Sequence, residues 1–127
     1  MIYKTSTKTP LQRVKDEFEE HTKEKSFGVL GSYEFKKILH SKGFDLEKDI
    51  TVYEVCNPNA ALKILTAFPE ISAYLPCRIS VYEENGETVI TTIDMRDVVK
   101  TLDVDADYKA HMNSVFEILI NIMNSWK

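Results

Sequence analysis

Residues 77–95 read CRISVYEENGETVITTIDM, in which Asn85-Gly86 separates two runs rich in β-branched and aromatic residues. A type I′ turn needs positive φ angles at both central residues, and Asn and Gly adopt that conformation most readily. The segment therefore predicts a β-hairpin with a two-residue turn, a feature that constrains the fold more than any other in the chain. The turn also predicts the register, which pairs Val81 with Ile90, Tyr82 with Val89, and Arg78 with Ile93.

The predicted register distributes the side chains of the hairpin over two faces of a sheet. One face carries Cys77, Ile79, Val81 and Ile90, and the other carries Arg78, Ser80, Tyr82, Val89 and Ile93. Neither face is plainly polar, whereas an antiparallel sheet with one solvated face alternates more cleanly. We therefore expect a partner subunit to cover part of the second face, or a pocket to lie against it. The alternative is a solvated face with scattered apolar residues, which is common in proteins.

Strands and helices alternate along the rest of the chain. The sequence predicts strands at 2–6, 27–35 and 49–56, and helices at 9–25, 33–42, 58–68, 95–102 and 108–126. In the last helix, apolar residues recur with helical periodicity and predict a face turned toward the core. This stripe comprises Tyr108, Met112, Val115, Phe116, Leu119, Ile122, Met123 and Trp126. Ile118 and Ile120 lie off the stripe, where contact with a second chain is the expected role.

Two of the predicted helices carry recognisable start signals. Thr9 precedes Pro10, and Gln12 completes a capping-box pattern with Thr9. Asn57 precedes Pro58, and the residue before a proline is extended, as an N-cap residue is. We therefore expect Thr9 and Asn57 to cap their helices. In the second of these helices, the residues expected to face the core are Ala61, Leu62, Ile64, Leu65 and Phe68.

Length and composition limit the class of protein. A chain of 127 residues has the size of one ordinary domain, so we expect a single domain over residues 1–127. The net charge of -4 offers no phosphate-neutralising surface, so we expect no nucleic-acid partner. No apolar run is long enough to span a bilayer and no signal peptide is visible, so we expect no membrane partner. Two cysteines without a signal peptide indicate the reducing cytoplasm.

Residues 56–95 combine a CNP motif with a later LPC motif and the string VYE. This combination resembles the uncharacterised "domain of unknown function 302" family, as does the upstream segment FGVLGSYEFKKILHSKGF, residues 27–44. The resemblance implies an α+β fold of two layers, with a mostly antiparallel sheet packed on helices. It further implies an order similar to the TATA-box-binding protein, β-α-β(4)-α with an inserted helix, and a homodimer. It implies no established activity.

The two cysteines mark the region where we expect a site. Cys56 lies just before a predicted helix N-terminus, where the helix dipole favours an anion such as a thiolate. Cys77 lies beside Arg78, whose cation can lower a thiol pKa or hold an anionic ligand. The simplest alternative is that both cysteines are small apolar side chains that pack in the core. The candidate ligand-binding residues are therefore Cys56, Asn57, Pro58, Cys77 and Arg78.

Two functions are compatible with these residues. The first is non-enzymatic binding of a small ligand or a protein partner near Cys56 and Arg78. The second is a thiol-dependent redox or sulfur-carrier role for Cys56, Cys77 or both. We expect no metal, because the histidines show no ligand spacing with either cysteine, and no cofactor, because no cofactor motif is present. If the helix at 58–68 joins parallel strands, the two cysteines lie at opposite ends of the sheet, whereas antiparallel strands allow them to meet. The family resemblance favours the antiparallel case.

Overall fold

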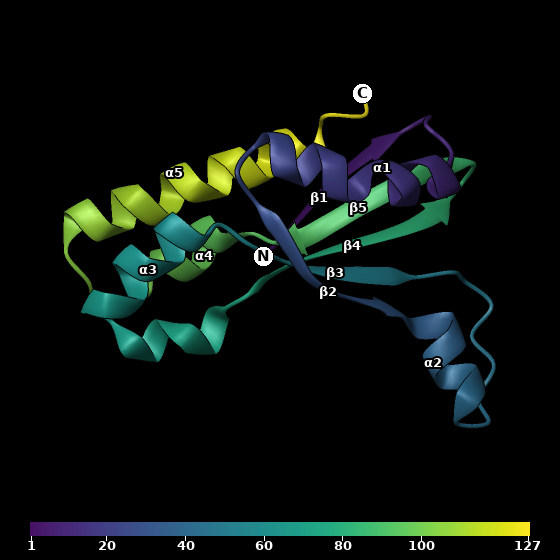
Figure 1. Ribbon diagram of the computed structural model, residues 1–127, viewed down its shortest axis with the longest axis horizontal. Helices are drawn as coiled ribbons and strands as arrows, with labels where there is room; N and C mark the ends of the chain where they lie inside the picture. The colour runs from purple at the N-terminus through teal and green to yellow at the C-terminus, as the bar shows by residue number, and fades with distance from the viewer.

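The computed structural model describes residues 1–127 and contains one sheet with helices packed on it (Figure 1). The elements in chain order are β1 (Ile2–Thr7), α1 (Leu11–Glu24), β2 (Gly28–Glu34), α2 (Phe35–Ser41), β3 (Thr51–Cys56), α3 (Pro58–Ala67), the 3₁₀ helix η1 (Pro69–Tyr74), β4 (Cys77–Glu84), β5 (Glu87–Ile93), α4 (Met95–Val99) and α5 (Ala106–Met123). The predicted α+β class with an antiparallel sheet is therefore confirmed.

The five strands follow the order β1-β5-β4-β3-β2, and every pair of neighbours is antiparallel. The hairpin of β4 and β5 has the predicted turn, because φ is 54° at Asn85 and 79° at Gly86. The predicted register is confirmed for two pairs, Val81 with Ile90 and Tyr82 with Val89. The paired region ends at Ser80 and Thr91, two residue pairs before the expected Arg78–Ile93 pair.

Helices α1 and α5 pack on one face of the sheet and lie on the same side of it in Figure 1. Alternate residues of β3, namely Thr51, Tyr53 and Val55, are buried, as expected for a strand with one face on a core. The fully buried Phe18 of α1 stacks on Tyr53, with ring centroids 3.9 Å apart. The core comprises Val14, Phe18, Phe27, Tyr53, Val55, Ile79, Val81, Ile90, Phe116, Leu119, Ile122, Met123 and Trp126.

The other face of the sheet carries the alternate residues of the five strands, and none of them belongs to this core. We call this second surface the open face. Helix α2 does not contribute to the core, because none of its residues is buried. In Figure 1 it projects at the lower right, away from α1 and α5. The fold is thus two layers, with one face of the sheet covered by helices of the same chain.

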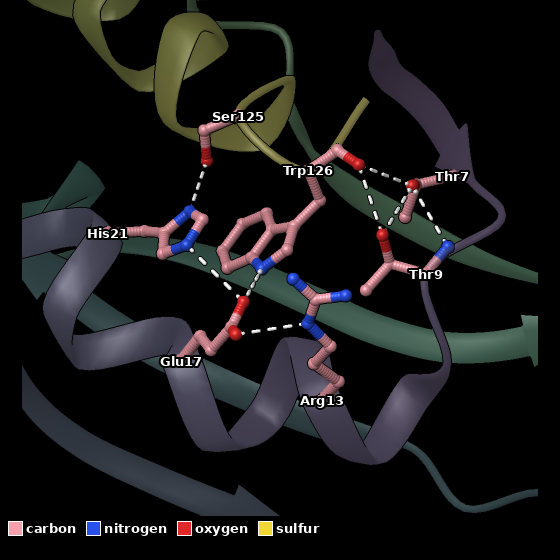
Figure 2. Close-up of polar contacts among 7 residues, drawn as sticks. All are labelled: Thr7, Thr9, Arg13, Glu17, His21, Ser125 and Trp126. Carbon is pink, nitrogen blue, oxygen red and sulfur yellow. Dashed lines mark hydrogen bonds and ion pairs between the residues drawn. The ribbon is translucent and has the colours of Figure 1, made fainter.

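The end of the chain is anchored around Trp126 (Figure 2). The Trp126 indole stacks on His21, with centroids 4.0 Å apart, and donates its N–H to Glu17 Oε1 at 3.1 Å. The Trp126 carbonyl oxygen accepts hydrogen bonds from the hydroxyls of Thr7 at 2.9 Å and Thr9 at 3.1 Å. The hydrogen bond from Arg13, above all, holds the pKa of the Glu17 carboxyl below its usual value. These contacts join the segments around residues 7–21 to the residues after α5.

This arrangement corrects the predicted start of α1. The helix begins at Leu11 with no side-chain cap at Pro10. The Thr9 hydroxyl donates a hydrogen bond to the Trp126 carbonyl. The Gln12 side-chain amide donates to Asp16 Oδ1 at 2.8 Å and does not reach back to Thr9. The predicted capping box of Thr9 and Gln12 is therefore wrong: the Thr9 hydroxyl is turned toward the far end of the chain and accepts no hydrogen bond from the first turn of α1.

Two further expectations about packing need revision. Leu62 of α3 is 69% exposed and does not face the core, whereas Ile64 of the same helix is buried as predicted. Ile118 and Ile120 of α5 pack against the core of their own chain, so contact with a second chain is not needed to explain them. The stripe of α5 is confirmed for its second half, in which Phe116, Leu119, Ile122, Met123 and Trp126 are all buried.

Candidate functional site

A pocket of about 340 Å³ lies at the end of the sheet where β3 ends and β4 begins. Helix α3, η1 and the middle of α5 form most of its walls, together with the ends of the two strands. Sixteen of its 20 lining residues are hydrophobic, and the other four are Asn57, Ser72, Pro76 and His111. No lining residue is an Asp, Glu, Lys or Arg. The pocket is therefore an apolar site with very few groups that form hydrogen bonds.

The start of α3 is built as the sequence predicts. The Asn57 side chain accepts a hydrogen bond from the Ala60 N–H at 3.2 Å, and the Ala61 N–H donates to the Asn57 carbonyl at 2.9 Å. Pro58 has no N–H to offer. Most of the donors at this helix end are therefore absent or already paired within the helix, and the site is a poor one for an anion.

The structure brings Cys56 and Cys77 into the same pocket. Strands β3 and β4 are antiparallel and Val55 pairs with Cys77, so Cys56 ends its strand one residue beyond that pair. Both thiols are free and half-buried. The antiparallel geometry that allows the two cysteines to meet is thus the one observed. Asn57 also lines the pocket, but Pro58 does not.

Arg78 lies elsewhere. Its side chain is on the open face, where Nη2 is 3.3 Å from Glu54 Oε2, and Glu54 Oε1 accepts a hydrogen bond from the Tyr33 hydroxyl at 2.7 Å. Because side chains alternate along a strand, Arg78 points away from the side that Cys77 faces. The expectation that the guanidinium joins the two sulfur atoms around one site is therefore wrong. Arg78 pairs with an acid, which is one of the ordinary outcomes for an arginine among apolar neighbours.

The apolar surroundings of Cys77 affect its thiol through desolvation. Burial, and after it the neighbouring Cys56, raises the pKa of Cys77 to about 11. A thiol reacts as its thiolate, so a raised pKa makes Cys77 a weak nucleophile near neutral pH.

We expect iodoacetamide to alkylate Cys77 of the folded protein at pH 8 about 100-fold more slowly than an unperturbed thiol, because a pKa two units higher lowers the thiolate fraction about 100-fold. Mass spectrometry of tryptic peptides after timed labelling measures the rate at each cysteine. Labelling in urea is the control, since both cysteines then react as ordinary thiols. A rate for Cys77 in the folded protein close to its rate in urea would contradict the burial of this sulfur.

The sequence does not mark several residues of the pocket as site residues. The stripe of α5 predicts a core position for Met112 and Val115, and no motif singles out Met95 or His111. The stripe continues at constant periodicity across the point where its partner changes from the sheet to α3. Helical periodicity indicates that one face of α5 is covered, but it does not indicate which element covers it. No signal in the sequence therefore separates the pocket residues of α5 from its core residues.

The model of the family described as "Domain of unknown function DUF302" matches residues 2–126. A crystal structure of an uncharacterized conserved DUF302 protein from Bacillus stearothermophilus superposes with a TM-score of 0.90 and 27% sequence identity, over 99% of this chain and 98% of that chain. An uncharacterized protein of Aquifex aeolicus is 42% identical over 52 residues, which is 40% of this chain and 36% of that protein. No helix of the structure is long and apolar enough to cross a membrane.

Proposed function

The chain belongs to the DUF302 family, whose description assigns no activity, and we propose a function from the pocket itself: reversible binding of a small, uncharged, apolar molecule. The observation that carries the proposal is the lining, which is hydrophobic at 16 of 20 positions around about 340 Å³. Small-molecule sites span roughly 300–1,000 Å³ and are mainly apolar, with a few polar groups that orient the ligand. The pocket has the size and composition of such a site.

The chemistry of the lining restricts the ligand further. No carboxylate, ammonium or guanidinium lines the pocket, and most of the donors at the start of α3 are absent or paired within the helix. A charged ligand would lose its hydration without gaining a partner, which is strongly unfavourable. The polar groups present, the Ser72 hydroxyl and the His111 ring among them, suit at most a few hydrogen bonds. An aromatic molecule or a short aliphatic chain meets these conditions.

The test uses N-phenyl-1-naphthylamine, an uncharged apolar dye whose fluorescence rises in apolar sites. We expect saturable binding to the wild-type chain and at least about 10-fold weaker binding to Ala61→Phe, because the larger side chain fills part of the pocket. Leu62→Phe is the matched control, since Leu62 is the next residue of α3 and is 69% exposed. Its affinity should equal that of the wild type.

Two results would overturn the proposal. One is the absence of saturable dye binding to the wild-type chain. The other is an equal loss of affinity in Ala61→Phe and Leu62→Phe, which would place the dye on the outside of α3. Circular dichroism of each variant shows whether the fold is intact, so that a loss of binding reports on the pocket.

A second candidate is the thiol-dependent redox or sulfur-carrier role. The observation in its favour is that Cys56 and Cys77 are both free and line one pocket. The raised pKa of Cys77 works against it, since this thiol is protonated at neutral pH. Cys56 would therefore have to be the reacting sulfur. Loss of dye binding in Cys56→Ala and Cys77→Ala without a change in redox behaviour would favour the binding function.

We also propose that the chain acts as a single domain over residues 1–127 and as a homodimer in the cytoplasm, with an arrangement similar to the TATA-box-binding protein. The net charge of -4 supports a partner other than nucleic acid, because nucleic-acid surfaces are basic. Two free cysteines suit a reducing compartment. Expression with a fluorescent tag tests the location, and limited proteolysis tests the single domain.

A further inference from the structure

We propose that the open face of the sheet is the surface on which a second copy of this chain packs, with α2 and the loop after it extending the contact. The proposal is independent of the pocket, which lies at the other end of β3 from α2. The side chains, the charge and the size of this face favour such a contact.

The centre of the open face is lined by small side chains. One row of paired residues crosses all five strands and consists of Lys4, Thr91, Ser80, Val52 and Tyr33. The three central residues of this row are short, so that another surface can approach the strands closely. Larger apolar side chains lie nearer the two edges: the paired Ile2 and Ile93 are 63% and 51% exposed at one side, and Tyr33 on β2 is 41% exposed at the other. The Ile2–Ile93 pair forms an exposed apolar patch, and such patches mark interaction surfaces.

The charges of the open face are compensated within the chain. Arg78 Nη2 is 3.3 Å from Glu54 Oε2, and Lys4 Nζ is 4.0 Å from Glu84 Oε2. Among the strand residues of this face only the Glu87 carboxylate lies outside these two ion pairs, so the face carries little net charge and two copies of it can meet with little like-charge repulsion. A strongly basic or acidic partner would find no complementary field there. This balance favours a second copy, because a twofold dimer brings the same patch of each subunit together.

The exposure of helix α2 also favours contact with a second copy. It has seven residues and none is buried, and Phe44 just after it is 65% exposed. Isolated helices shorter than about 12–15 residues are marginal in water, so a helix this short is expected to gain stability from packing. The loop after α2 reaches the open face, where Lys48 Nζ lies 5.7 Å from the centroid of the Tyr82 ring and donates to the Glu83 carbonyl at 3.0 Å. In a twofold dimer, the α2 region of each copy can cover the partner's sheet.

The size of the surface suits a dimer. Five strands at a spacing of about 4.8 Å and six residues at about 3.3 Å each give a face of roughly 500 Å². A stable interface buries about 800 Å² on each partner, so the sheet supplies the larger share and the α2 region the rest. The related structure from Bacillus stearothermophilus is matched over 98% of its chain, so it adds no element that would cover this face.

The test is sedimentation velocity of the wild-type chain and of Ile93→Glu. We expect the wild type at about 50 µM to sediment as a dimer of the 14.6 kDa chain, and Ile93→Glu to dissociate with a Kd at least about 100-fold higher. Leu62→Glu is the matched control, because Leu62 is 69% exposed on α3, away from this face, and its variant should remain a dimer. Ser80→Glu, in the central row, is a second variant with the same expected loss.

The proposal is overturned if the wild-type chain is a monomer at this concentration. It is also overturned if Ile93→Glu and Ser80→Glu, both folded by circular dichroism, dimerise as tightly as the wild type. Equal dissociation of Leu62→Glu would move the interface to α3 and refute the open face as the contact. Dye binding to the pocket is measured on the same variants, so that loss of the dimer and loss of the proposed ligand site are distinguished.

Discussion

Replacing Phe18 by Ala is expected to lower the free energy of unfolding by about 3–5 kcal/mol, the largest effect of any single change considered for this chain. Phe18 is fully buried in α1, stacks on Tyr53 at 3.9 Å and lies 6.0 Å from the ring of Trp126. The substitution removes the ring that joins the helix layer to the sheet and leaves a cavity that neighbouring side chains fill only in part. Urea denaturation followed by circular dichroism measures the change.

The control for Phe18→Ala is Leu62→Ala, which removes an apolar side chain that is 69% exposed. We expect its free energy of unfolding to stay within about 0.5 kcal/mol of the wild type, as for most surface positions. A loss below about 1 kcal/mol for Phe18→Ala would show that the cavity collapses, or that the stack on Tyr53 is absent in solution. The two variants together therefore separate burial from the mere loss of an apolar group.

The second large effect is expected at Trp126. Trp126→Ala should lower the free energy of unfolding by about 3 kcal/mol, because it removes a buried ring that stacks on His21 and lies parallel to Phe18. Trp126→Phe keeps an aromatic ring but loses the N–H that donates to Glu17 Oε1 at 3.1 Å. Its stability should therefore lie between those of the wild type and Trp126→Ala. Thermal unfolding monitored by circular dichroism measures all three proteins.

The series at Trp126 separates ring packing from hydrogen bonding. If Trp126→Phe is as unstable as Trp126→Ala, the hydrogen bond to Glu17 dominates and the stack with His21 contributes little. If both variants match the wild type, the contacts drawn in Figure 2 do not hold the end of the chain in solution. The backbone carbonyl of residue 126 is present in both variants, so its hydrogen bonds with Thr7 and Thr9 are the same in all three proteins.

The features that the sequence predicts well are those decided by neighbours in the chain. The hairpin turn and its register depend on Asn85 and Gly86, whose positive φ angles are observed. The cap of α3 depends on Asn57 and Pro58, and the expected hydrogen bond to the Ala60 N–H is present. In each case the required backbone conformation is favoured by the residues themselves, so that tertiary contacts reinforce a local preference.

The features that the sequence could not give depend on distant segments. Thr9 has all the local marks of a cap, but its hydroxyl is bound by the carbonyl of Trp126. Arg78 is a different case, because the predicted hairpin already places it on the face opposite Cys77. What the sequence does not give is its partner, Glu54 of the neighbouring strand. The pocket itself is formed where α3 and η1 meet α5 at the ends of β3 and β4, and this arrangement of distant segments has no signature in a single sequence.

The placement of β1 has a consequence for synthesis on the ribosome. β1 is made before its partner strand β5, with which it pairs as Ile2 does with Ile93, and the Thr5 hydroxyl also donates to Asn124 Oδ1 at 2.8 Å, after α5. β1 therefore has no partner strand until β5, residues 87–93, has left the exit tunnel. A nascent chain that ends before residue 87 should remain sensitive to protease in β1.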